Sequence, residues 1–241
     1  YLIECGGGSL ARIDPTYESE YEHTIEKIEA CGYNRKQVKW VLNTHCHVDH
    51  AMADRKFHDL GAQILVHESD AAAIEKATRV TGYYITKFKF PACPVDRRLV
   101  DGEEVQLGNK LFHVIHTPGH TPGSASFLLQ VDGKNLLFAG DTALYDGRLA
   151  WQGNPYADNR AYLASLEKLV GFNLGTGPFQ WDVLLPGHGC ISMSRADLDV
   201  RKDLDWAKME AETLGEIRSI PYSLAAYRTR MYGRPATEYH P

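Results

Sequence analysis

The sequence predicts an α/β fold in which two β-sheets stack face to face and helices cover their outer sides. Strand-like and helix-like segments alternate over the first part of the chain, and three strand-like segments follow one another within residues 111–139. Runs of strands with helices between them are typical of layered α/β architectures. The 241 residues are 44% apolar, which is enough to form a core of ordinary size.

The first half is expected to begin with two strands, residues 1–5 and 10–14, joined by a glycine-rich turn. Apolar side chains then recur at helical spacing over residues 21–31, and Gly32 ends this helix. The next elements alternate between strand and helix, at 38–43, 51–60, 63–66 and 69–77. Ser69 is the expected N-cap of the last of these helices.

Residues 80–99 interrupt this alternation. Four aromatic residues, Tyr83, Tyr84, Phe88 and Phe90, lie among lysines and prolines there. This composition predicts a long aromatic loop, and long loops in compact domains often contribute to function. An ordinary packed insertion is the alternative.

The second half is expected to contain four strands and two helices. The strands lie at 111–115, 125–130, 136–139 and 183–185. One helix covers 160–170, and a longer one runs from Ser194 to about residue 218, with Asp197 in a capping-box position. The tail from Pro221 is expected to be helical and then irregular.

We expect one domain over residues 1–241, with 80–99 as an aromatic insertion and 194–241 as a helical C-terminal extension. The net charge is −5 and no basic stripe is present, which argues against a nucleic-acid partner. No stretch approaches the ~20 apolar residues that span a bilayer, which argues against a membrane partner. The expected partner is a small-molecule substrate, and a homo-oligomer is compatible with the sequence. The five cysteines include no CxxC pair, which favours a reducing compartment, so we expect the cytoplasm.

The strongest functional signal is the segment THCHVDH at residues 44–50, directly after an expected strand. Side chains two residues apart in an extended chain point to the same side, so His45 and His47 are expected to share one metal ion. Where the chain turns into the next helix, Asp49 and His50 face elsewhere and can hold a second one. Imidazole and carboxylate ligands suit zinc, manganese or iron. The alternative, surface histidines in a polar loop, would place like charges together.

Three further strand ends carry similar residues. HTPGH at 116–120 follows one strand, and its proline and glycine predict a sharp turn that can aim His120 inward. Asp141 follows a second strand, and His188 follows a third. Each of these signals alone is typical of a structural loop, but four strand-end signals in one chain predict a metal site.

The motif order HCHVDH, HTPGH, GD and PGH resembles that of the metallo-β-lactamase superfamily of hydrolases, including its lactonase and glyoxalase II-like members. The resemblance covers residues 1 to about 188. It implies a four-layer αβ/βα sandwich of two mixed β-sheets flanked by helices, with the metals at one edge. Two glycines commonly follow the first motif in this family, whereas Ala51 and Met52 stand there in this chain.

The resemblance also implies a dinuclear metal site and the side chains that form it. The implied ligands of the first metal are His45, His47 and His120. Those of the second are Asp49, His50 and His188. Asp141 is implied to bridge both. This set implies two divalent cations, with zinc as the expected metal and manganese or iron as alternatives. His116, the first histidine of its motif, is implied to be structural.

The implied reaction is attack of a metal-bridging hydroxide on an electrophilic carbonyl. Asp49 is expected to be catalytic, because its carboxylate can orient the hydroxide and receive its proton. Tyr145, four residues after Asp141, is the second expected catalytic residue, with its phenol near the developing oxyanion. The alternative for Tyr145 is a packing role.

Hydrolysis of a carboxylic ester or lactone is the first expectation for the substrate. A thioesterase of glyoxalase II type is the second, and the long helix and arginines near the C-terminus fit it. A β-lactamase-like amide hydrolase is disfavoured, because true β-lactamases lack a carboxylate at the position of Asp141. A nuclease of the superfamily is disfavoured by the lack of a basic surface. A mononuclear iron sulfur dioxygenase is a further alternative, and metal analysis separates it from a hydrolase.

Overall fold

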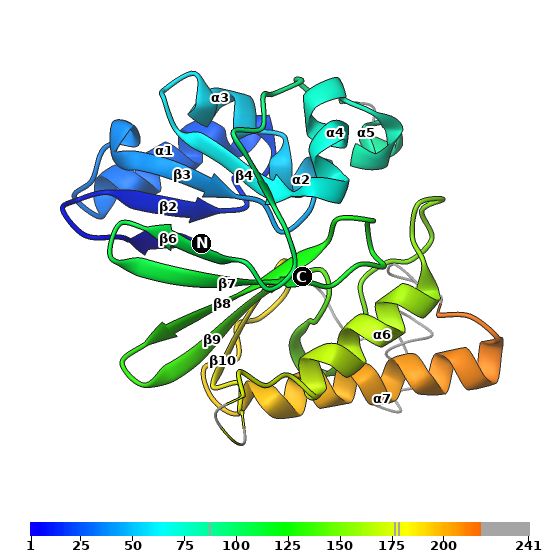
Figure 1. Ribbon diagram of the computed structural model, residues 1–241. Coiled ribbons are helices and arrows are strands. Elements are labelled where there is room, and N and C mark those ends of the chain that lie inside the picture. The colour runs from blue at the N-terminus through cyan, green and yellow to red at the C-terminus, as the bar shows by residue number, and fades with distance from the viewer. Residues whose placement is uncertain (87, 176, 178, 218–241) are drawn as a thin grey trace, which may run out of the picture.

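The computed structural model describes residues 1–86, 88–175, 177 and 179–217, which form two five-stranded mixed sheets (Figure 1). The first sheet has the order β1 (Leu2–Glu4), β2 (Leu10–Ile13), β3 (Val38–Leu42), β4 (Gln63–His67) and β5 (Arg97–Leu99). The second has the order β10 (Val183–Pro186), β9 (Lys134–Gly140), β8 (Ala125–Val131), β7 (Lys110–His116) and β6 (Glu104–Leu107). The β1–β2 pair is antiparallel and β2 to β5 are parallel, whereas β10 is parallel to β9 and the remaining pairs are antiparallel.

Helices cover the outer face of each sheet. Those over the first sheet are α1 (Tyr21–Ala30), α2 (Val48–Ala51), α3 (Asp54–His58), α4 (Glu68–Lys76) and α5 (Tyr83–Thr86). Those over the second are α6 (Asn159–Val170) and α7 (Ala196–Leu214). Short 3-10 turns complete the described elements: η1 (Glu18–Glu20), η2 (Arg35–Gln37), η3 (Arg79–Thr81) and η4 (Tyr145–Gly147). The layers run helix, sheet, sheet, helix, which confirms the predicted four-layer sandwich.

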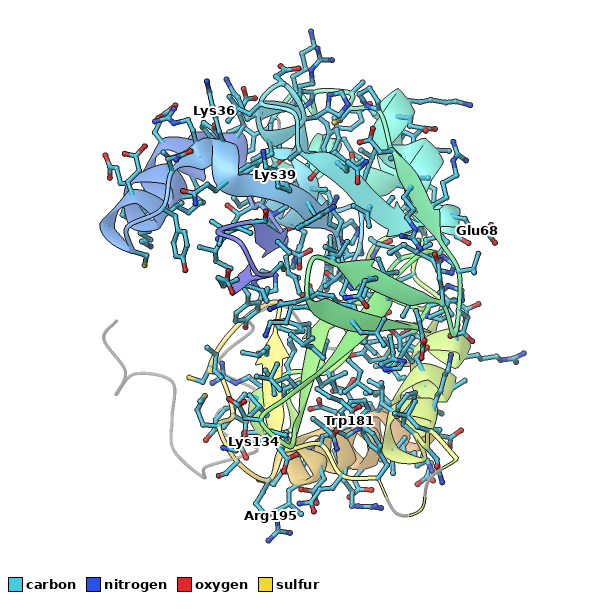
Figure 2. The ribbon with its side chains drawn as sticks, turned by 60° about the vertical axis from the view of Figure 1, so that its left-hand side comes forward. Lys36, Lys39, Glu68, Lys134, Trp181 and Arg195 are labelled. Carbon is cyan, nitrogen blue, oxygen red and sulfur yellow. The ribbon has the colours of Figure 1, made fainter. Side chains whose placement is uncertain are left out.

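Three apolar clusters fill the spaces between these layers. The cluster between the sheets contains Leu42, Leu65 and Phe127, each almost fully buried. A second cluster joins the first sheet to its helices, and a third joins the second sheet to α6 and α7. Trp181 belongs to the third and lies between that sheet and α7 in Figure 2. Because the first five residues of β8 (Ala125–Val131) are buried on both faces, its sequence does not alternate between apolar and polar residues.

The structure corrects the helix predicted at 51–60. Two short helices, α2 and α3, replace it, and the first begins three residues earlier, at Val48. The break falls at Ala53, whose backbone N–H donates to Thr16 O at 3.0 Å instead of continuing α2. A tertiary hydrogen bond of this kind leaves no periodicity in the sequence.

Both predicted N-caps are wrong. His67, not Ser69, precedes α4, and its Nδ1 accepts a hydrogen bond from the Ser69 N–H. Helix α7 begins after Arg195, whose backbone is left-handed, with no side-chain cap. The long helix therefore starts at Ala196 rather than at Ser194.

The described part of 80–99 is not one long loop, because it includes part of η3, all of α5 and the edge strand β5. The short strand β6 was not predicted, since it has four residues with only two buried side chains. The tail from Pro221 and the last part of the predicted 194–241 extension lie outside the described residues. In the described part of the chain, no helix is long and apolar enough to cross a membrane.

Candidate metal centre

The side chains of the predicted metal site all follow the carboxyl ends of strands. Residues 44–50 follow β3, His120 follows β7, Asp141 follows β9 and His188 follows β10. Strands β7, β9 and β10 run in one direction, because β8 is antiparallel to β7 and β9 while β10 is parallel to β9. Their carboxyl ends therefore meet at one edge of the sandwich, which brings these distant residues together.

The first group consists of three buried imidazoles. His45 Nε2 lies 3.1 Å from His47 Nδ1, and His47 Nδ1 lies 2.9 Å from His120 Nε2. Burial lowers the pKa of all three, and that of His47 to about 3. The imidazoles are therefore neutral at neutral pH, and neutral nitrogens that face one another are suited to share a cation.

The second group lies on the more open side of the site. His188 Nε2 is 3.3 Å from His50 Nε2 and 3.2 Å from Asp49 Oδ2. The side chain of His188 is 45% exposed and that of Asp49 is 28% exposed, whereas His50 is buried. Solvent therefore reaches the site from the side of Asp49 and His188.

Asp141 lies between the two groups. Its Oδ2 is 3.3 Å from His120 Nε2 and 3.4 Å from His188 Nε2, and its Oδ1 is 3.5 Å from His50 Nε2. Oδ1 is buried and has no hydrogen-bond partner. A buried carboxylate oxygen without a partner is costly unless a cation or water binds it, so the position fits a metal ligand.

The structure thus brings together all seven predicted ligands. We call them the His/Asp cluster: His45, His47, Asp49, His50, His120, Asp141 and His188. Three groups can be drawn from these residues, and within each group all ligand atoms lie within 4.8 Å of one another. The groups are His45/His47/His120, His45/His50/Asp141 and Asp49/His50/His188. This set of imidazole and carboxylate donors fits a divalent cation.

Two glycines allow the loops to close around the cluster. Gly140 has a φ of +51°, and a Cβ there would lie 2.5 Å from Thr44 Oγ1. A Cβ on Gly187 would overlap Asp141 Oδ1 and lie 2.8 Å from His50 Cε1. The GD and PGH motifs therefore both need their glycines for space, and Gly140 is needed for its backbone conformation as well.

The sequence analysis missed Asp14, which holds two parts of the first motif. Its Oδ2 accepts a hydrogen bond from His50 Nδ1 at 2.9 Å. Its two oxygens also accept from the Thr44 backbone N–H at 2.7 Å and the Thr44 hydroxyl at 2.8 Å. This contact leaves His50 Nε2 free to face the cluster. A signal was present, because Asp14 directly follows β2 just as Asp141 directly follows β9.

Other contacts orient His120 toward the cluster and give His116 partners outside it. His120 Nδ1 donates to the backbone oxygen of Trp151 at 3.0 Å, which turns Nε2 toward the cluster. His116 stacks on His67 with ring centroids 3.8 Å apart, and its Nε2 donates to Pro122 O at 3.0 Å. This packing fits the structural role expected for His116. Tyr145 is exposed at the start of η4, and its catalytic role stays a prediction.

The charges of the second group depend on whether a cation is present. Burial opposes protonation of His50, but the carboxylates of Asp141, Asp49 and Asp14 outweigh it and raise its pKa to about 9. Hydrogen bonds to Asp141 and Asp49 raise the pKa of His188 to about 11. Although burial opposes ionisation, His50 and His188 hold the pKa of Asp49 and Asp141 well below the usual range. The two carboxylates thus require positive charge nearby, from protons or from a metal.

Metal loading is therefore expected to release protons. Without a cation, His50 and His188 are protonated at neutral pH, and each must lose its proton to offer a nitrogen lone pair. We expect about two protons per chain to be released on zinc binding, fewer as the pH rises above the pKa of about 9 for His50. Isothermal titration calorimetry in buffers of different ionisation enthalpy measures this number. No release at neutral pH would contradict the assignment of both histidines.

Known proteins resemble this chain in sequence and in fold. The family model described as the metallo-beta-lactamase superfamily matches residues 1–188. The hydroxyacylglutathione hydrolase of Acidiphilium cryptum is 30% identical over 208 residues, which cover 85% of this chain and 70% of that protein. An uncharacterized protein of Mycobacterium leprae is 32% identical over 169 residues, covering 65% of this chain and 71% of that protein.

Two solved structures share the fold at low identity. A metallo-beta-lactamase family protein from Thermus thermophilus has a TM-score of 0.70 at 24% identity, with 89% of this chain and 75% of that chain covered. The subclass B3 metallo-beta-lactamase of Bradyrhizobium japonicum has a TM-score of 0.68 at 21% identity, with 95% and 88% covered. At these identities the likeness supports the architecture alone.

Proposed function

The chain belongs to the metallo-beta-lactamase superfamily and is a metal-dependent hydrolase, and from this premise we propose that it hydrolyses a carboxylic thioester at a site for two divalent cations. The observation that carries the proposal is the convergence of the His/Asp cluster. His45, His47 and His120 would hold one cation. Asp49, His50 and His188 would hold the other, with Asp141 between them. Zinc is the expected metal, with manganese and iron as alternatives.

Such a pair of cations would polarise the substrate carbonyl and lower the pKa of a bound water molecule. The protein's own groups orient the reactants. Asp49 lies on the open side, and we assign its carboxylate the task of accepting a proton from the attacking water. Tyr145 is proposed to donate its phenol hydrogen to the oxygen that becomes negative.

Relatives named hydroxyacylglutathione hydrolase support the thioester as the first candidate. Besides the protein of Acidiphilium cryptum, that of Methylococcus capsulatus is 34% identical over 152 residues, although only 50% of its length is covered. A carboxylic ester or lactone, the first expectation from the sequence, becomes the second candidate. The exposed phenol of Tyr145, four residues after Asp141, favours it.

A substrate panel tests the proposed function. Purified metal-loaded protein is assayed with acyl thioesters, carboxylic esters, lactones, β-lactams and phosphodiesters, and kcat/KM is compared. We expect the highest value for a thioester. A higher value for an ester or lactone would select the second candidate. Turnover of β-lactams or phosphodiesters alone would reject both.

Two described residues of the segment 80–99, Gly82 and Phe88, connect it to the surroundings of the cluster. Gly82 lies against His47, since a Cβ there would be 3.7 Å from His47 Cδ2. Burial and the charge of Asp49 raise the pKa of Tyr17, and the Tyr17 ring packs edge-on against Phe88 with centroids 5.8 Å apart. Phe88 is nonetheless 49% exposed. We propose that the rings of Tyr17 and Phe88 contact the acyl group of the substrate.

Replacing Phe88 with alanine is expected to raise KM about tenfold for substrates with a large apolar acyl group, because burying a Phe side chain contributes roughly 1.5–3 kcal/mol. Acetyl substrates and metal content are expected to change little. Leu111→Ala is the control, because Leu111 is also exposed but lies near the amino end of β7, away from the cluster. A Phe88→Ala variant whose KM is unchanged for every acyl group would show that the segment does not contact the substrate.

A further inference from the structure

The carboxyl group of Asp70 lies outside the His/Asp cluster, yet it contacts two of the loops that carry the cluster. Asp70 is in the first turn of α4, and its side chain is fully buried. Oδ2 accepts hydrogen bonds from the Cys46 N–H at 2.9 Å and the Thr121 hydroxyl at 2.7 Å. Oδ1 accepts one from the Gly123 N–H at 2.7 Å. Both oxygens are therefore used, and all three donors belong to ligand-bearing loops.

The donors are close neighbours of the histidines. Cys46 lies between His45 and His47, and Thr121 directly follows His120. One loop leaves β3 in the first sheet, and the other leaves β7 in the second. Asp70 thus connects segments from different sheets at the point where their imidazoles meet.

The second loop packs directly onto this carboxyl. A Cβ on Gly123 would lie 2.5 Å from the Asp70 backbone nitrogen and 2.6 Å from its Cβ and Cγ. The Thr121 hydroxyl also lies 2.9 Å from Ser124 Oγ, which is itself buried. The contact is therefore tight, and a small shift of the Asp70 side chain would displace the loop of His120.

We propose that Asp70 is a positioning residue of the metal site, which fixes the loop of His45 and His47 against the loop of His120 so that three imidazole nitrogens converge on one cation. This inference rests on the proposed function, because it takes these histidines as ligands. Asparagine cannot make the same contacts, since one of its two acceptor oxygens becomes an NH2 group that faces a donor. Loss of a group that orients metal ligands typically weakens metal binding about 10- to 100-fold.

Asp54 offers a matched control. Its side chain is also fully buried, and its Oδ2 accepts a hydrogen bond from the Asn43 side chain at 2.7 Å. Burial raises the pKa of both carboxyl groups. Both aspartates are therefore buried carboxyl groups with a raised pKa, but the hydrogen bond of Asp54 goes to Asn43 rather than to the donors that Asp70 holds.

The test compares Asp70→Asn with Asp54→Asn and the unmodified protein. Zinc affinity is measured by competition with a chromophoric chelator, ligand geometry by the visible spectrum of the cobalt-substituted protein, and stability by Tm. Both variants are expected to lower Tm. Only Asp70→Asn is expected to lower zinc affinity 10- to 100-fold and to change the cobalt spectrum. Unchanged zinc affinity in Asp70→Asn, or an equal loss in both variants, would overturn the proposal.

A milder variant keeps the test decisive if Asp70→Asn does not fold. Thr121→Val removes one of the three hydrogen bonds at nearly constant volume, and we expect it to weaken zinc binding by a smaller factor. Unchanged zinc affinity in this variant would overturn the proposal. If the unmodified protein bound no zinc, manganese or iron, the proposed metal site itself would be overturned. If the unmodified protein bound zinc and the variants bound it equally well, only the role of Asp70 would be overturned.

Discussion

Replacing Asp49 with alanine is expected to lower kcat/KM about 10³-fold or more, while the protein stays folded. The change removes a carboxylate that lies 3.2 Å from His188 Nε2 and that we assign both metal binding and proton transfer. Positioned proton transfer alone typically contributes about 10²–10⁴-fold. Asp49 is 28% exposed in the short helix α2, so its truncation leaves no large cavity. Steady-state kinetics together with thermal unfolding measure both expectations.

Asp59→Ala serves as the control for this variant. Asp59 is an exposed carboxylate that pairs with Arg55 at 2.8 Å, and exposed pairs of this kind contribute little to stability. We expect its kcat/KM to match that of the unmodified protein. If Asp49→Ala retained full activity, neither role assigned to Asp49 could stand.

Removal of metal is expected to abolish hydrolysis completely, and zinc or manganese is expected to restore it. In the metal-free protein, the raised pKa values of His50 and His188 leave both imidazoles protonated at neutral pH, so the second group holds no free nitrogen. Protons can balance the charge of Asp49 and Asp141, but they cannot polarise a carbonyl as a divalent cation does.

The assay dialyses the protein against a chelator and then adds back one metal at a time. Magnesium serves as a control, because it prefers oxygen ligands and is not expected to restore activity at a histidine-rich site. The metal-free protein is also expected to have a lower Tm, because binding to the folded state alone stabilises it. Hydrolysis that persists after complete metal removal would reject the mechanism.

The sequence predicts the main architecture and the cluster for one physical reason. Motifs such as THCHVDH concentrate chemically demanding side chains at strand ends, and strands that run in one direction bring these ends together. The seven predicted ligands accordingly meet at one edge of the sandwich. Spacing separated His45 and His47 from Asp49 and His50, and the resemblance to a known family supplied the places of His120, His188 and Asp141.

The features missed by the sequence analysis depend on tertiary contacts. Asp14 and Asp70 are single carboxylates whose importance comes from donors far away in the chain, such as Thr44 and Thr121. The break between α2 and α3 arises from one hydrogen bond to Thr16. The start of α7 depends on a left-handed residue, Arg195, rather than on a side-chain cap. Apart from the strand-end position of Asp14, these features leave no periodic or compositional signal.

The central claim, that the His/Asp cluster holds two divalent cations, is tested most directly by metal analysis combined with anomalous diffraction from crystals of the metal-loaded protein. We expect two ions per chain, about 3.5–4 Å apart, one beside His45, His47 and His120 and one beside Asp49, His50 and His188. A single iron per chain accompanied by oxygen uptake, or metal bound away from these side chains, would contradict it.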